Sequence, residues 1–152
     1  MKLYLTKTPR IIQKIFKKYT WRFVVKKKEI FLTFDDGPTP EITTWTLDIL
    51  KKHKAKATFF CIGKNVIAEP DIYLRILKEG HQVGNHTQNH KNGSKTSVKD
   101  YISNFIAAEK SLQNTSKLFR PPYGKIKKNQ AQKILSLGYN IIMWDVLSAD
   151  FD

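Results

Sequence analysis

The sequence predicts an α/β fold in which the strands of a parallel sheet alternate with amphipathic helices. Five short segments rich in β-forming apolar residues are separated by segments whose apolar residues recur at helical spacing. Two carboxylates, Asp35 and Asp36, directly follow the first of these apolar segments. Because the carboxyl ends of strands are where ligands bind in α/β proteins, a functional site is expected there.

Size and composition suit one globular domain. The chain has 152 residues, of which 41% are hydrophobic and 26% are charged. No apolar run approaches the ~20 residues of a membrane span, so no transmembrane segment is predicted. No secretory signal is recognisable either, so the cytoplasm is the default expectation for its location.

The net charge of +14 would favour any polyanionic partner. It arises from 27 Lys and Arg against 13 Asp and Glu, and the lysines are scattered along the chain. No nucleic-acid-binding signature accompanies them, so nucleic acid is not expected as a partner. A solvated cationic surface is the favoured interpretation.

The N-terminal residues 1–28 are expected to form a basic extension in front of a domain over residues 29–152. Residues 9–20 predict an amphipathic helix that begins at Pro9. Its apolar stripe is expected to pack against the domain, and binding to a membrane surface is the alternative. The stripe consists of Ile11, Ile12, Ile15, Phe16 and Tyr19.

The first predicted strand is a buried one, Ile30 to Phe34, which stops at Asp35-Asp36-Gly37-Pro38. Neighbouring residues that leave a strand point in different directions. One carboxylate can therefore bind a metal while the other moves a proton. An ordinary turn is the alternative, because Asp, Gly and Pro are common in turns.

A helix from Pro40 to about His53, a strand over 57–62, a helix over 71–79 and a strand over 81–86 follow. The last of these strands runs into His86 and His90. Histidines four residues apart share one face of a helical turn, where they can bind one ion, and imidazole suits zinc. A chance pair is the alternative unless a third ligand exists, which Asp36 supplies.

The second half predicts a helix over 97–113, a strand at 118–119, a helix over 129–137 and a strand over 139–146. The strand at 118–119 ends in Arg120-Pro121-Pro122-Tyr123-Gly124. The prolines restrict this backbone, so Arg120 is placed to orient a carboxylate; a surface loop with an unpaired arginine is the alternative. A closed (β/α) barrel typically needs eight strands and about 250 residues, so a barrel here would be incomplete.

Four segments resemble the motifs of the polysaccharide deacetylase family, also called the NodB-homology domain of carbohydrate esterases. They are residues 33–38 (Thr-Phe-Asp-Asp-Gly-Pro), 86–90 (His-Thr-Gln-Asn-His), 120–124 (Arg-Pro-Pro-Tyr-Gly) and 144–151. The resemblance covers residues 29–152. It implies a distorted, incomplete (β/α) barrel that lacks its C-terminal strands. It also implies removal of acetyl groups from an acetylated glycan, either N-acetylglucosamine polymers such as peptidoglycan and chitin, or xylan.

The resemblance also implies a role for each matching residue. Asp35 would be the general base and Arg120 would orient it, while Asp36, His86 and His90 would bind a divalent ion. Zn²⁺ is the expected metal, with Co²⁺, Mn²⁺ or Ni²⁺ as alternatives. Two imidazoles and one carboxylate leave positions open on zinc for water and substrate, which is the pattern of catalytic zinc sites.

The remaining implied roles concern the substrate. The backbone N–H of Tyr123 would stabilise the oxyanion, with Pro122 and Trp144 beside it at the substrate. Leu147 and Phe151 stand where the fourth motif of the family usually has Asp and Trp. This departure affects the shape of the pocket and leaves the metal ligands in place.

The chain ends before the family's fifth motif, a Leu-any-His segment that supplies the general acid. Asp150, which tunes that histidine in the family, therefore has no partner here, and His53 and His81 begin strands on the face away from the metal. We expect the 152 residues to be part of a longer protein. On their own they would leave an exposed edge beside the first strand and be marginally stable.

Three functions remain open from the sequence. The favoured one is a metal-dependent hydrolase that deacetylates a glycan. A remnant that binds metal or sugar without turnover is the second, and a non-haem iron oxygenase, which also uses two histidines and a carboxylate, is the third. The second carboxylate beside the ligand favours hydrolysis. The polymer, the preference for N- or O-acetyl groups, the oligomeric state and the compartment stay undecided, since the family often acts on cell-envelope glycans.

Overall fold

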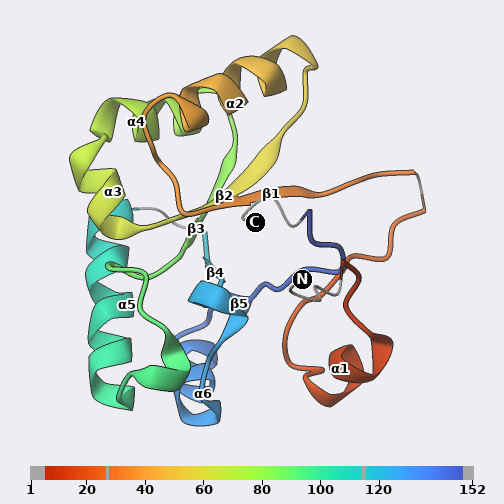
Figure 1. Cartoon of the computed structure of the whole chain (residues 1–152), viewed down its shortest axis with the longest axis vertical. Coiled ribbons are helices and arrows are strands. Elements are labelled where there is room, and N and C mark those ends of the chain that lie inside the picture. The colour runs from red at the N-terminus through yellow and green to blue at the C-terminus, as the bar shows by residue number, and fades with distance from the viewer. Residues whose placement is uncertain (1–5, 27, 114–115, 149–152) are drawn as a thin grey trace, which may run out of the picture.

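A five-stranded parallel sheet forms the centre of the structure (Figure 1). The computed structural model describes residues 6–26, 28–113 and 116–148. The strands lie side by side in chain order and every neighbouring pair is parallel, which confirms the predicted α/β class. They are β1 (Leu32–Asp35), β2 (Ala57–Cys61), β3 (Gln82–Asn85), β4 (Leu118–Phe119) and β5 (Asn140–Ile141).

Helices that connect successive strands cover the outside of this sheet (Figure 1). Four of them agree with the predicted helices to within a few residues, whereas α3 was not predicted, because it is short and begins at a glycine. Among the described residues, every helix falls short of the length and hydrophobicity that a bilayer span requires. The helices are α2 (Ile42–Lys52), α3 (Gly63–Ala68), α4 (Pro70–Lys78), α5 (Val98–Leu112) and α6 (Lys128–Ser136).

Two clusters of buried apolar side chains hold the helices to the sheet. The first lies beneath α2, α3 and α4 and includes Leu47, Phe59 and Ile76. The second joins α5 and α6 to β4 and β5, with Phe105 stacked edge-on against Phe119 at a centroid distance of 5.2 Å. The long helix α5 reaches both clusters because its buried residues recur at helical spacing. They are Tyr101, Phe105, Ala108 and Leu112.

The prediction that the first strand is buried is wrong. Strand β1 begins only at Leu32, and Ile30 and Phe31 before it are 86% and 56% exposed. Among the described residues β1 pairs with β2 alone, so its other side is an open edge. An edge strand leaves the backbone N–H and C=O groups of one side unpaired, which agrees with the exposed edge expected from the sequence.

The fifth strand is shorter than the predicted span of 139–146. Regular pairing with β4 stops at Ile141, and the N–H of Met143 instead donates to the carbonyl of Thr20 at 2.8 Å. The carbonyls of Ile142 and Met143 accept hydrogen bonds from the buried Arg120 guanidinium, at 3.2 and 3.0 Å. Beyond Ile141, the Arg120 side chain therefore provides the hydrogen-bond donors that a neighbouring strand would otherwise provide.

The N-terminal helix α1 (Arg10–Ile15) is shorter than predicted, and most of the predicted apolar stripe is exposed, whereas Tyr19, beyond the end of the helix, packs against the second core cluster. None of the helix residues is buried, and Ile11 and Ile15 are 68% and 67% exposed. The attachment of the helix is polar instead: the N–H of Thr8 and the side chain of Gln13 donate to Asp145. Figure 1 shows α1 apart from the other helices, beside the segment that follows β5.

We expect the substitution Leu47→Ala to lower the free energy of unfolding by roughly 2–5 kcal/mol, because Leu47 is fully buried in the first cluster and its loss leaves a cavity. The matched control is Leu74→Ala on α4, where the same side chain is 54% exposed and the cost should stay near ~0.5 kcal/mol. Urea unfolding followed by circular dichroism measures both. Equal losses for the two variants would contradict the packing described above.

Candidate active site

The predicted site residues gather at the carboxyl ends of the strands, around a cleft of about 740 Å³. The cleft is lined from one side by residues that follow β1 and β3 and from the other by residues that follow β4 and β5. The strands of a parallel sheet all end at the same edge, so segments far apart in sequence converge there. The lining includes Asp35, Asp36, His86, His90 and Arg120.

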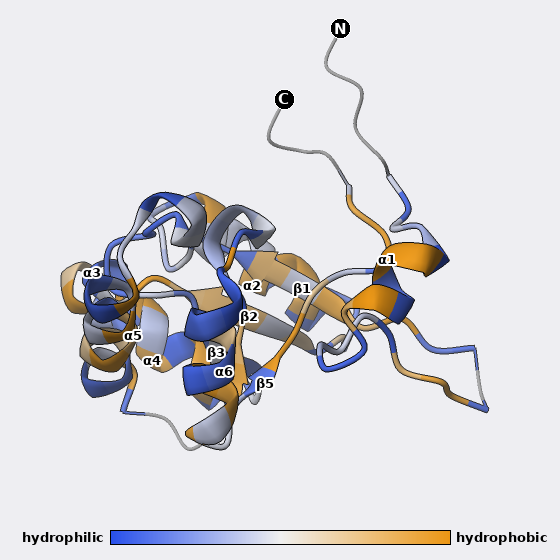
Figure 2. Cartoon of the chain, turned by 90° about the horizontal axis from the view of Figure 1, so that it is seen from below, coloured by the Kyte–Doolittle hydropathy of each residue, from blue (hydrophilic) through white to orange (hydrophobic). Residues whose placement is uncertain are grey.

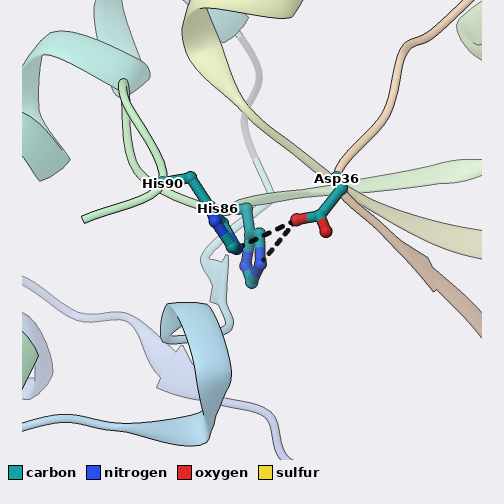
Figure 3. Close-up of side chains that lie close together, drawn as sticks. All are labelled: Asp36, His86 and His90. Carbon is teal, nitrogen blue, oxygen red and sulfur yellow. Dashed lines mark ion pairs between the residues drawn. The ribbon is translucent and has the colours of Figure 1, made fainter. Parts of the chain in front are cut away.

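Asp36, His86 and His90 form a compact group of three ligand atoms (Figure 3). Asp36 Oδ1 lies 3.3 Å from His86 Nε2 and 3.0 Å from His90 Nε2, and the three ligand atoms all lie within 4.8 Å of one another. His86 is buried and His90 is partly exposed, whereas the Asp36 side chain is 58% exposed.

The orientation of His86 shows that this group fits a metal ion. His86 Nδ1 lies 2.7 Å from the carbonyl oxygen of Arg120, and a carbonyl can only accept, so Nδ1 carries the proton. The neutral ring then turns the lone pair of Nε2 towards the Asp36 carboxylate. Two electron-rich atoms that face each other repel unless a second proton on the ring or a metal ion lies between them. Two imidazoles and a carboxylate are ligands that zinc accepts, with the open side of the group towards the cleft.

The two histidines come together by a route that differs from the predicted helical turn. Residues 86–90 form an irregular loop in which Thr87 and His90 have φ values of 65° and 50°. Two hydrogen bonds to the residues on either side hold this loop. Asn85 Oδ1 accepts from the N–H of Thr87 at 2.8 Å, and Thr87 Oγ1 accepts from the N–H of Lys91 at 3.2 Å. The pair is therefore positioned by loop hydrogen bonds and not by helical periodicity.

Arg120 contacts Asp35 directly, which excludes an unpaired arginine on a surface loop. Arg120 Nη1 donates to Asp35 Oδ1 at 2.7 Å and to Thr33 Oγ1 at 2.9 Å. The guanidinium is buried against the Phe60 ring, with 4.1 Å from its central carbon to the ring centroid. Burial lowers the pKa of Arg120 and the nearby Asp35 opposes that shift, while the hydrogen bond from Nη1 holds the Asp35 carboxylate in one orientation.

The residues predicted at the substrate occupy different places. Tyr123 is 61% exposed, has φ 60°, and its ring lies 4.5 Å from that of His90. Trp144 lines the cleft next to Gly124, whose φ of +64° and closeness to the indole leave no room for a Cβ atom. Pro122 is buried and is not among the cleft-lining residues. Asp150 lies outside the described residues.

Some residues at the site were not singled out from the sequence. Thr33 and Phe60 support the Arg120 guanidinium, and Ile42 lines the cleft from the start of α2. The alternation of side chains along a strand was a signal for Thr33, which must share a face with Asp35 two residues later. The other two histidines lie away from the cleft lining: His53 caps the end of α2, and buried His81 accepts a hydrogen bond from the N–H of Ala57.

Residues 22–142 match the family model described as polysaccharide deacetylase. A peptidoglycan-N-acetylglucosamine deacetylase from Bacillus cereus is 41% identical over 140 residues, which cover 88% of this chain and 51% of that protein. Chitin deacetylase 1 from Saccharomyces cerevisiae is 34% identical over 123 residues, 78% of this chain and 40% of that protein. The chain thus spans about half the length, or less, of these relatives.

Solved structures give the same result. A peptidoglycan N-acetylglucosamine deacetylase in complex with a naphthalenyl N-hydroxybenzamide matches with a TM-score of 0.82 and 39% identity, over 90% of this chain and 65% of that one. A CE4 family pseudoenzyme from Bacillus anthracis matches with a TM-score of 0.70 and 28% identity, over 82% of this chain and 46% of that one. The overlap covers most of the described sheet, and confirms the predicted incomplete barrel.

We expect His86→Ala and His90→Ala each to lower the affinity for Zn²⁺ by at least about 10²-fold, because each removes one of three converging ligand atoms. The control is His53→Ala, since His53 is exposed at the end of α2. Competition with a chromophoric chelator measures the affinity, and circular dichroism checks the fold. Unchanged Zn²⁺ affinity in both ligand variants would rule out this metal site.

Proposed function

Because the chain belongs to the polysaccharide deacetylase family, we propose that it hydrolyses N-acetyl groups on a glycan of the cell envelope. The observation that carries the proposal is the arrangement of Asp35, fixed by Arg120, beside the metal-binding group of Asp36, His86 and His90. We infer that the substrate is peptidoglycan, since the relatives at 41% identity are named for it and the chitin-active ones are less similar.

In the proposed reaction Asp35 takes the proton from the water that attacks the acetyl carbonyl. Arg120 orients this carboxylate, since its guanidinium is itself fixed by two carbonyls, by Thr33 and by the Phe60 ring. A divalent ion, when bound, supplies Lewis-acid polarisation of the carbonyl and a lowered pKa for water, and Zn²⁺ is the metal we propose.

The opposite wall of the cleft would hold the acetyl group and the sugar. We propose that the backbone N–H of Tyr123 donates to the developing oxyanion, with Pro122 fixing the backbone on which Tyr123 sits. Trp144, close to Gly124, would contact the acetyl group or the sugar ring. Asp150 is proposed to tune the histidine that serves as the general acid in the family, as the family resemblance implies.

A second candidate function is binding without turnover. One of the structural relatives is a pseudoenzyme, and among the described residues that line the cleft the only histidines are His86 and His90. A protein with the metal-binding group and no group to protonate the leaving amine would bind metal and glycan and release no acetate. We keep this as the alternative.

We expect Asp35→Asn to lower acetate release by roughly 10²–10⁴-fold, because the amide cannot accept the proton, while Zn²⁺ affinity stays unchanged. The measurement is acetate released from peptidoglycan fragments and chitooligosaccharides with Zn²⁺ present. It should be made on the 152-residue chain and on one extended through the native reading frame. Thr39→Ala, which alters a cleft-lining hydroxyl away from the Arg120 contacts, serves as a control for general damage.

Acetate from the extended chain that depends on Asp35 would support the deacetylase. Normal Zn²⁺ affinity without acetate from either chain would favour the binding remnant. Release that persists in both Asp35→Asn proteins would show that another group is the base and would overturn the assignment of Asp35.

A further inference from the structure

A second hollow, of about 470 Å³, lies beside α1 and shares no lining residue with the catalytic cleft. Half of its lining residues are cationic and none carries a carboxylate. Such a concentration of one sign attracts anions and raises their local concentration. The lining residues are Arg10, Gln13, Lys14, Lys17, Tyr19, Thr20, Trp21 and Arg22.

Exposed apolar side chains stand next to these cations. Ile11 and Ile15, one helical turn apart, are 68% and 67% exposed, and Phe16 is 47% exposed. Arg10 and Lys14 form the adjoining row on the same short helix, so its exposed side is half cationic and half apolar. Figure 2 shows α1, whose ribbon is coloured orange at its hydrophobic residues, at the end of the molecule opposite α3 and α5.

The surface is built into the fold. The Phe16 and Tyr19 rings stack at 5.6 Å, and Trp21 Nε1 donates to the carbonyl of Phe16 at 3.2 Å. Tyr19 and Trp21 pack in turn on the second core cluster. Gln13 Nε2 donates to Asp145 Oδ1 at 2.8 Å, so this carboxylate already has a hydrogen-bond partner on the helix. The cations and the apolar side chains are thus held in fixed relation to the sheet.

We propose that α1 and the segment up to Arg22 form a docking surface for an anionic lipid bilayer. The cations around the hollow bind lipid phosphates, Ile11, Ile15 and Phe16 enter the boundary of the acyl chains, and the aromatic rings lie at the level of the headgroups. A soluble phosphodiester polymer would satisfy the cations and leave the isoleucines in water. The lipid bilayer is the partner whose chemistry matches both halves of the surface.

Docking here would also orient the catalytic cleft. The hydroxyl of Thr8 donates to the carbonyl of Trp144 at 2.8 Å, and Gln13 binds Asp145, so α1 is tied to the segment that forms one wall of the cleft. Binding to the bilayer does not depend on the proposed deacetylase activity and is measured separately from it.

The test is co-sedimentation of the 152-residue chain with vesicles of phosphatidylcholine alone and with vesicles that also contain phosphatidylglycerol. We expect binding only to the anionic vesicles. We expect it to fall roughly tenfold or more with Lys14→Glu and Lys17→Glu together, and also with Ile11→Ser and Ile15→Ser together. The matched control is Lys51→Glu with Lys52→Glu, an equal charge change on exposed residues at the end of α2.

Three outcomes would overturn the proposal. Equal losses for the control and the α1 charge variant would show attraction by net charge alone. Full binding by the isoleucine variant, with loss in the charge variant, would show recognition of phosphate without insertion. Binding of wild-type protein to phosphatidylcholine vesicles at the same level would show that the lipid charge is irrelevant. Thermal melts of all variants check that these exposed substitutions leave the fold intact.

Discussion

The buried guanidinium of Arg120 is the contact on which the rest of the site depends. A charge removed from water is costly unless its hydrogen bonds are satisfied, and Arg120 satisfies them with two carbonyls, a hydroxyl and a carboxylate. Its own carbonyl accepts from His86, so the same residue orients both the proposed base, Asp35, and one of the proposed metal ligands, His86. It thereby joins β1, the loop after β3, β4 and the segment after β5.

Backbone strain is concentrated around this residue. Among the described residues, seven other than glycine have positive φ, and four of them are Asp36, Thr87, His90 and Tyr123. Each such residue costs free energy that the surrounding structure has to supply. At this site the sheet, the loop hydrogen bond of Asn85 and the ring contact between His90 and Tyr123 hold these four residues in their strained conformations.

The site has two halves with different structural origins. The proposed metal-binding half comes from the ends of β1 and β3, and the proposed substrate half comes from the ends of β4 and β5. Arg120 connects the halves. A chain can keep this framework without turnover, as the similarity to a named pseudoenzyme illustrates, because metal ligation and protonation of the leaving group are separate requirements.

The sequence alone determined the α/β class, the order of strands and most helices, and the group of Asp35, Asp36, His86, His90 and Arg120. These follow from local signals: apolar periodicity, turn residues, and polar residues placed directly after strands. Local signals cannot show which apolar side chains are covered by another element of the fold. The exposed edge of β1 and the exposed isoleucines of α1 have the same apolar pattern as buried elements.

Only the tertiary structure decided how the site residues meet. It placed His86 and His90 on an irregular loop. It ended β5 at the point where the next carbonyls accept hydrogen bonds from Arg120, and it brought Thr33 and Phe60 into contact with the guanidinium. These contacts join residues up to 87 positions apart, so no spacing in the sequence encodes them. The physical reason is that a buried charge collects partners from whichever strands pass near it, and that depends on the packing of the whole sheet.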